Sequence, residues 1–230
     1  MKFGLLIAIE RELKAFLEEY GSSLAAEQAC GRTVYQARIG EHEVYALCSG
    51  CGEIDAAAGT QLLIARYGCQ AMLNFGVAGA LDPALRVEDL FLVSKVRHYD
   101  FDISDIDPVR PHQYSEFPDE FMPLDAELIA RARAVFPSIR ETAVASGDKF
   151  VADQSVKREL FSLGCQICEM EIAGIARTCF LNGIPCLSVK CISDTYDGGA
   201  GDFAANVAAG AQKAFSVLQR ILMSPQAEKR

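Results

Sequence analysis

The segment 3–20, FGLLIAIERELKAFLEEY, predicts the class of fold. Its first half, Phe3–Ile9, is a continuous apolar run, which is typical of a strand buried on both faces of a sheet. Its second half, Glu10–Tyr20, carries two leucines and a phenylalanine at helical spacing. A buried strand followed directly by an amphipathic helix is the repeating unit of α/β folds.

The same alternation continues along the chain. Because nearly all-apolar strands need cover on both faces, it predicts an α/β fold with helices on both sides of a sheet. No linker or internal repeat interrupts the pattern, so we expect one domain over residues 1–230. Further strands are expected at 34–39 and 43–48 (a hairpin through Gly40), 71–75, 89–96, 142–146, 166–168 and 185–192, and further helices at 54–67, 124–135, 154–163, 171–181 and 203–222.

Two segments fall outside this alternation. The acidic, proline-containing stretch 98–123 is expected to be a long excursion, either an active-site loop or an interface element. The tail 224–230 is expected to fray.

The charge balance bears on the class of ligand. The chain has 22 basic and 31 acidic residues, a net charge of -9. No lysine- or arginine-rich stripe is available to replace phosphate counterions, which argues against nucleic-acid binding. No apolar run approaches the roughly 20 residues of a membrane-spanning helix, and Glu10 and Glu12 follow the first apolar run without a signal-peptide cleavage site. We expect a cytoplasmic protein that binds a neutral or cationic small molecule and no membrane.

Nine cysteines could suit disulfides or a metal site. Their number is odd, and most lie in apolar runs, where a free thiol behaves as a small hydrophobe. Two CxxC pairs occur, Cys48 with Cys51 and Cys165 with Cys168, but they lie much farther apart than the roughly 15–20 residues between the pairs of a zinc ribbon. The acidic stretch that begins at His98 is favoured as a solvated loop over a cation site. We therefore expect free thiols in a reducing compartment, no metal and no cofactor.

Binding sites in α/β sheets lie beyond the carboxyl ends of the strands. Four of the expected strand ends carry a carboxylate, and none carries a histidine. The three histidines fall in expected turns or in the long excursion, where surface or supporting roles are favoured. The serines at these ends lack the GxSxG context of a nucleophile. Residues 76–80, GVAGA, are neither GxGxxG nor a phosphate loop and, taken alone, predict only a tight turn. The expected ends are 10–12, 49–52, 76–80, 146–151, 169–171 and 193–197.

Six short motifs are collinear with a known family. In this order and spacing the chain resembles the 5′-methylthioadenosine/S-adenosylhomocysteine nucleosidases, within the purine nucleoside phosphorylase and nucleosidase superfamily, over nearly its whole length. The resemblance implies a nucleoside phosphorylase-like three-layer sandwich, in which helices flank a mixed central β-sheet. The motifs are IERE at 9–12, SGCG at 49–52, GVAG at 76–79, SGD at 146–148, EME at 169–171 and ISD at 192–194.

The resemblance implies hydrolysis of the N-glycosidic bond of an adenine nucleoside. Asp194 matches the general acid that protonates or hydrogen-bonds N7 of the departing adenine, and Glu12 matches the residue that activates water toward C1′. Paired carboxyls in different environments are a familiar solution to glycoside cleavage. Burial should raise the pKa of Asp194, so that it holds a proton near neutral pH.

The resemblance also implies the rest of the pocket. Glu171 would accept hydrogen bonds from the ribose hydroxyls, and Met170 would pack against the sugar. Ile106, in the long excursion, would contact the 5′-substituent of the neighbouring subunit's ligand in a homodimer. The purine would lie against Phe150, Val151 and Ser193, and the remaining lining would come from Ile9, Gly76, Val77, Ala78 and Phe203.

Alternatives remain open on the same residues. The family usually has serine at Val77, arginine at Lys190 and an acidic residue at Arg11, which allows a nucleosidase of shifted specificity, such as one acting on futalosine. A purine nucleoside phosphorylase is disfavoured because its phosphate-binding arginine motifs are absent, and a carboxylate at Glu12 would repel phosphate. A non-catalytic nucleoside-binding module is disfavoured because Glu12, Glu171 and Asp194 are all present.

Overall fold

β5 (Ala71–Ala80) runs through the middle of the sheet, and its ten residues are all buried. It pairs in parallel with β1 (Lys2–Ile7) and β10 (Cys186–Asp194), and antiparallel with β9 (Ile167–Glu169). This computed structural model describes residues 1–224. Apart from Lys2 and Asn74, β1 and the first half of β5 are apolar, as expected of central strands whose two faces are covered.

The remaining strands extend the sheet in two directions. Beyond β1, the order continues through β4, β3 and β2. On the other side β10, β6, β8 and β9 lead back to β5, so these strands close into a ring. Parallel and antiparallel pairs occur together, which confirms the mixed sheet. The bounds are β2 (Ala25–Ala29), β3 (Arg32–Ile39), β4 (His42–Cys48), β6 (Leu90–His98), β7 (Met122–Pro123) and β8 (Arg140–Ser146).

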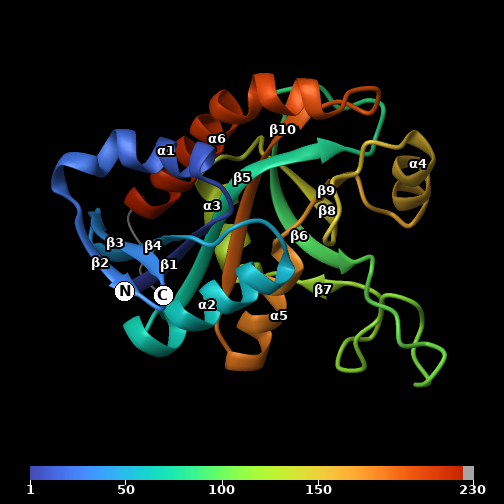
Figure 1. The fold of residues 1–230 in the computed structure, drawn as a ribbon, viewed down its shortest axis with the longest axis horizontal. Helices are drawn as coiled ribbons and strands as arrows, with labels where there is room; N and C mark the ends of the chain where they lie inside the picture. The colour runs from blue at the N-terminus through green and yellow to red at the C-terminus, as the bar shows by residue number, and fades with distance from the viewer. Residues whose placement is uncertain (225–230) are drawn as a thin grey trace.

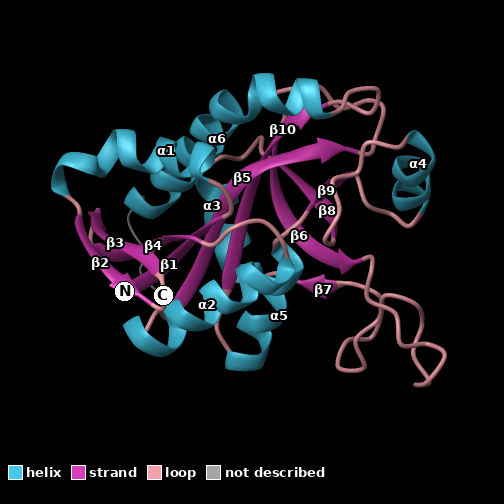
Figure 2. Ribbon diagram, viewed as in Figure 1, coloured by secondary structure: helices cyan, strands magenta, loops and turns pink. Residues whose placement is uncertain are grey.

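Helices cover both faces of the sheet (Figures 1 and 2). On one face α1 packs on α6, and on the other α2 packs on α5. α4 lies at the edge of the molecule next to β8 and β9 (Figure 1). The predicted three-layer arrangement is therefore confirmed. The helices are α1 (Glu10–Tyr20), η1 (Gly21–Ser23, a 3₁₀ turn), α2 (Glu53–Tyr67), α3 (Ala126–Val135), α4 (Gln154–Ser162), α5 (Ile172–Asn182) and α6 (Ala200–Met223).

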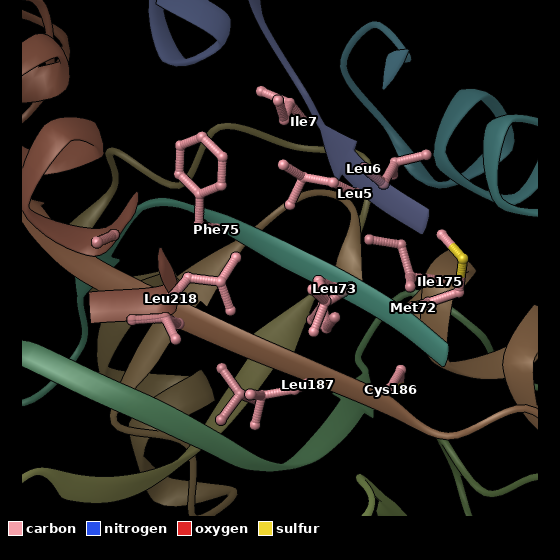
Figure 3. Close-up of a cluster of buried hydrophobic side chains, with 14 of the residues drawn as sticks. Leu5, Leu6, Ile7, Met72, Leu73, Phe75, Ile175, Cys186, Leu187 and Leu218 are labelled. Carbon is pink, nitrogen blue, oxygen red and sulfur yellow. The ribbon is translucent and has the colours of Figure 1, made fainter. Parts of the chain in front are cut away.

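The main core is one cluster that joins the central sheet to helices on both of its faces, among them α6 on one face and α5 on the other (Figure 3). Leu5 from β1, Leu73 and Phe75 from β5, Leu187 from β10 and Leu218 from α6 are all buried. Each buried leucine contributes roughly 1.5–3 kcal/mol relative to an exposed one. This packing fixes the relative positions of the strand ends that lead into the site.

One strand was not predicted, and one expectation about a strand is wrong. Residues 25–29 form the edge strand β2, which the sequence did not indicate because four of its five residues are exposed and carry no apolar alternation. Residues 76–80 are not a tight turn but the second half of β5. Their glycines permit close approach of other side chains rather than a reversal of the chain.

Other expectations have mixed outcomes. The stretch 99–121 is an irregular excursion, as expected, and ends at β7. His42, expected in a turn, is instead the buried first residue of β4 and packs edge-on against Phe3. Within residues 1–224 no helix has both the length and the apolar character to cross a membrane. The predicted frayed tail lies outside the described residues, apart from Ser224.

Candidate active site

The carboxyl ends of β1, β5, β9 and β10 surround a cavity of about 280 Å³. Most of the predicted site residues line it, although they come from opposite ends of the chain. Further residues to which the sequence assigned no role also line it, among them Cys51, Lys149, Cys168 and Glu169. The predicted residues that line it are Ile9, Glu12, Val77, Ala78, Phe150, Val151, Met170, Glu171, Ser193, Asp194 and Phe203.

Two predicted residues do not line the cavity. Gly76 lies behind Glu12, where any side chain would collide with the Glu12 carboxylate, so its contribution is the space that it leaves. Ile106 lies on the 99–121 excursion and is 80% exposed, outside the cavity of its own chain.

Glu12 lies in the first turn of α1 and is only 4% exposed. Its Oε1 accepts a hydrogen bond from the backbone N–H of Val77 at 2.9 Å. Its Oε2 is buried and has no hydrogen-bond partner among residues 1–224. Burial raises the pKa of Glu12, and the charge of Lys190 opposes that rise. An unpartnered buried carboxylate oxygen in a cavity is an acceptor available to a ligand or water.

Asp194 ends β10 and is only 2% exposed. The β10–β5 register shifts between Ile192 and Asp194, and such irregularities redirect side chains at strand ends. Ser193 Oγ donates a hydrogen bond to Asp194 Oδ1 at 2.8 Å. Burial raises the pKa of Asp194, while the Ser193 hydrogen bond and the nearby charge of Lys157 oppose the rise. The carboxyl therefore favours its protonated form more than an exposed aspartate does.

Glu171 belongs to a buried group of carboxylates. Its Oε1 accepts a hydrogen bond from the backbone N–H of Gly52 at 3.1 Å. Burial raises the pKa of Glu171 to about 8, with a further contribution from the charge of Glu169. Lys190, itself buried, donates a hydrogen bond from Nζ to Glu169 Oε2 at 3.0 Å and partly neutralises the group.

Ser146 joins two carboxyl groups in the same buried network. Ser146 Oγ lies 2.5 Å from Glu53 Oε1 and 2.5 Å from Glu169 Oε1, and it accepts the N–H of Ala173. A hydroxyl has one proton to donate, so the second carboxyl must hold a proton of its own. Burial beside Glu169 raises the pKa of Glu53 to about 9, which assigns that proton to Glu53. Sequence patterns did not single out Glu53, because a glutamate in the first turn of a helix is common.

Two aromatic side chains also line the cavity. Phe150 and Phe203 contact each other edge to face, with ring centroids 5.8 Å apart. The guanidinium of Arg11 lies 5.4 Å from the centre of the Phe203 ring. The cavity thus joins an acidic, buried floor to an apolar wall, an arrangement suited to a ligand with a flat apolar ring and a polar, hydroxyl-bearing part.

Comparisons with known proteins identify relatives of this chain. A family model described as the phosphorylase superfamily matches residues 2–223. An aminodeoxyfutalosine nucleosidase of Campylobacter jejuni is 30% identical over 201 residues, which cover 84% of this chain and 86% of the relative. A 5′-methylthioadenosine/S-adenosylhomocysteine nucleosidase of Shewanella piezotolerans is 30% identical over 211 residues, covering 88% and 90%.

Solved structures give the same result. A futalosine hydrolase mutant of Helicobacter pylori superposes with a TM-score of 0.90 at 27% identity, covering 96% of this chain and 98% of that one. A mutant of the Helicobacter pylori 5′-methylthioadenosine/S-adenosylhomocysteine nucleosidase, with 5′-methylthioadenosine in its active site, superposes with a TM-score of 0.89 at 26% identity, covering 96% and 97%.

Proposed function

Because this chain belongs to the phosphorylase superfamily, we propose that it is an N-glycosidase, a nucleosidase that hydrolyses the bond between adenine and ribose in an adenine nucleoside. The substrates are 5′-methylthioadenosine and S-adenosylhomocysteine, and the released base is adenine. The observation that supports this most directly is that Glu12, Glu171 and Asp194 line one cavity, with an unpartnered oxygen on Glu12 and a raised pKa on Asp194.

The reaction needs an acid and a base. Asp194 gives its proton to N7 of the purine, the C1′–N9 bond breaks, and its electron pair moves into the departing ring. Water, held by Oε2 of Glu12, adds its oxygen to C1′ and gives a proton to the Glu12 carboxylate. Exchange with solvent then returns the enzyme to its starting state. Each such proton transfer commonly contributes about 10²–10⁴-fold in rate.

The remaining residues hold the nucleoside. Glu171 binds the ribose hydroxyls, and Met170 packs on the sugar. Phe150, Val151 and Ser193 contact the purine. All of these line the cavity. The apolar side chains of Ile9 and Phe203 complete the wall, and no cofactor or metal takes part in the scheme.

Water is a better nucleophile for this site than phosphate. Glu12 lines the cavity and must be ionised to act as the base, so its negative charge would repel a phosphate dianion. Lys190 is already hydrogen-bonded to Glu169. A phosphorolytic reaction is therefore disfavoured.

A second substrate class is an adenine nucleoside with a larger 5′-substituent. The aminodeoxyfutalosine nucleosidase of Campylobacter jejuni matches this chain as well as the methylthioadenosine nucleosidases do. Val77 adds a methyl-bearing side chain to the cavity where the family usually has serine. The chemistry at C1′ is the same for both classes, so the 5′-substituent alone separates them.

The same proposal includes a cytoplasmic homodimer built from one domain over residues 1–230. The nine cysteines are all free thiols, which suits a reducing compartment. Ile106 is exposed on the 99–121 excursion, and Leu181 is 65% exposed at the end of α5, so each offers apolar surface to a second copy.

One assay tests reaction and substrate together. Purified protein is mixed with methylthioadenosine, S-adenosylhomocysteine or aminodeoxyfutalosine, with and without phosphate, and adenine and the sugar product are measured. We expect adenine and free sugar at a rate independent of phosphate. A ribose 1-phosphate product whose formation requires phosphate would show that the chain is a phosphorylase.

A further inference from the structure

Lys157 is a fully buried charged residue that the proposed reaction does not use. It lies on α4, the helix that follows Phe150 and Val151 in the chain. A buried ammonium group is costly unless its donors and its charge are satisfied. Its contacts therefore show which part of the molecule it serves.

All three donors of Lys157 are directed at one loop. Nζ donates to the backbone carbonyl oxygens of Thr195 at 2.8 Å, Tyr196 at 3.1 Å and Gly198 at 3.1 Å. An ammonium group has three protons, so these acceptors use all of them. The loop begins directly after Asp194, and Lys157 thus fixes the segment that follows the proposed acid.

The charge of Lys157 also reaches Asp194. Nζ lies 3.9 Å from Asp194 Oδ2, at ion-pair distance but without a donor left to give. Asp194 Oδ1 accepts from Ser193, and among residues 1–224 no hydrogen bond is donated to Oδ2. Lys157 therefore acts on Oδ2 through charge alone and leaves that oxygen available to a ligand.

A second set of contacts holds the same loop to α4. The Tyr196 hydroxyl donates to the carbonyl oxygen of Gln154 at 3.3 Å, and Gln154 Nε2 donates to Asp197 Oδ1 at 3.0 Å. Neither of these contacts involves the Lys157 side chain. Variants at Lys157 can therefore separate two effects: the effect of its charge on Asp194, and its part in holding the loop in place.

We infer that Lys157 is a positioning residue that stabilises the carboxylate left on Asp194 after its proton has passed to the purine. The inference rests on the proposed function, since it needs Asp194 to be the acid. As the O–H bond of Asp194 breaks, its electron pair stays on the carboxylate, and a fixed positive charge at 3.9 Å favours that product. Burial and Lys157 act in opposite directions: burial keeps the proton on before the reaction, and Lys157 eases its departure.

The test compares Lys157→Met, which removes the charge at similar length, with Lys157→Arg, which keeps it. Arg158→Met is the matched control, because Arg158 is an exposed neighbour on the same helix. kcat and KM for methylthioadenosine are measured between about pH 5 and about pH 10, where the descending basic limb reports loss of the Asp194 proton.

We expect Lys157→Met to lower kcat roughly 10–100-fold, part of the 10²–10⁴-fold that acid catalysis contributes, with a smaller change in KM. Its basic limb should move to higher pH, because removing a nearby positive charge raises the pKa of a carboxyl group. In Lys157→Arg and Arg158→Met the basic limb of the kcat profile should lie at the same pH as in the unmodified protein.

A lower kcat in Lys157→Met with an unmoved basic limb would overturn the inference, because loss of loop geometry alone scales the rate without shifting the limb. If Lys157→Met does not fold, the test falls to Lys157→Arg, which keeps the positive charge. A basic limb of its kcat profile at a different pH from that of the unmodified protein would then overturn the inference. An unmodified protein that releases no adenine refutes the proposed function itself, and the inference with it. An active protein in which Lys157→Met behaves as the control refutes the inference alone.

Discussion

Oε1 of Glu12 accepts the backbone N–H of Val77 at 2.9 Å, which ties the first turn of α1 to the middle of β5. This bond holds one carboxylate oxygen and leaves the other, Oε2, without a partner among residues 1–224. Gly76 makes the arrangement possible, because a side chain there would occupy the space of the carboxylate.

Glu12→Gln should lower kcat by about 10²–10⁴-fold, because an amide cannot take the proton of the attacking water. The Gln side chain can still accept the Val77 N–H, so KM should change little. Glu10→Gln, an exposed change in the same turn, is the control and should leave kcat unchanged. The rates of steady-state adenine release are compared for Glu12→Gln, Glu10→Gln and the unmodified protein. Equal rates for Glu12→Gln and Glu10→Gln would exclude Glu12 as the base.

Gly76→Ala should lower kcat at least about tenfold and cost about 1–3 kcal/mol of stability, since the new methyl group meets the Glu12 carboxylate. The control is Gly201→Ala in α6, where nothing lies within 4 Å of the added carbon. That change should leave activity intact and stabilise the helix by about 0.5–1 kcal/mol. Urea unfolding and adenine release give both quantities. A fully active Gly76→Ala protein would contradict the close approach.

Glu53→Gln should make stability less dependent on pH. The pKa of Glu53 is raised from 4.5 to about 9, so its neutral form favours folding, and that contribution is lost as pH rises through the folded-state value. Between about pH 5 and about pH 9 the free energy of unfolding should therefore fall less steeply in Glu53→Gln than in the unmodified protein. Glu127→Gln, an exposed change on α3, should keep the original slope. Identical slopes in all three proteins would mean that Glu53 is not protonated in the fold.

Much of the fold could be predicted from the sequence because its central strands are mostly apolar. β1 and α1 were recognised from one segment, and the α/β class followed from its repetition. β2 could not be recognised, because an exposed edge strand has no buried face to impose an alternation. The extension of β5 through Gly76 and Gly79 was missed for a related reason: in sequence, glycines that make room for carboxylates look the same as glycines that make a turn.

The site was predicted less completely than the fold. The motifs around Glu12, Glu171 and Asp194 indicated most of the cavity, because they lie directly at strand ends. Lys157 and Glu53 were missed, since each lies on a helix where a charged residue normally faces solvent. Their burial depends on which distant segments pack against the helix, and such a relationship leaves no local pattern in the sequence.

The proposed acid provides the most direct test. Asp194→Asn keeps the size of the side chain and its contact with Ser193 but removes the transferable proton. Adenine release from methylthioadenosine should fall by at least about 100-fold, while calorimetry still detects binding of the nucleoside. An Asp194→Asn protein that releases adenine at the rate of the unmodified chain would contradict acid-assisted departure of the purine.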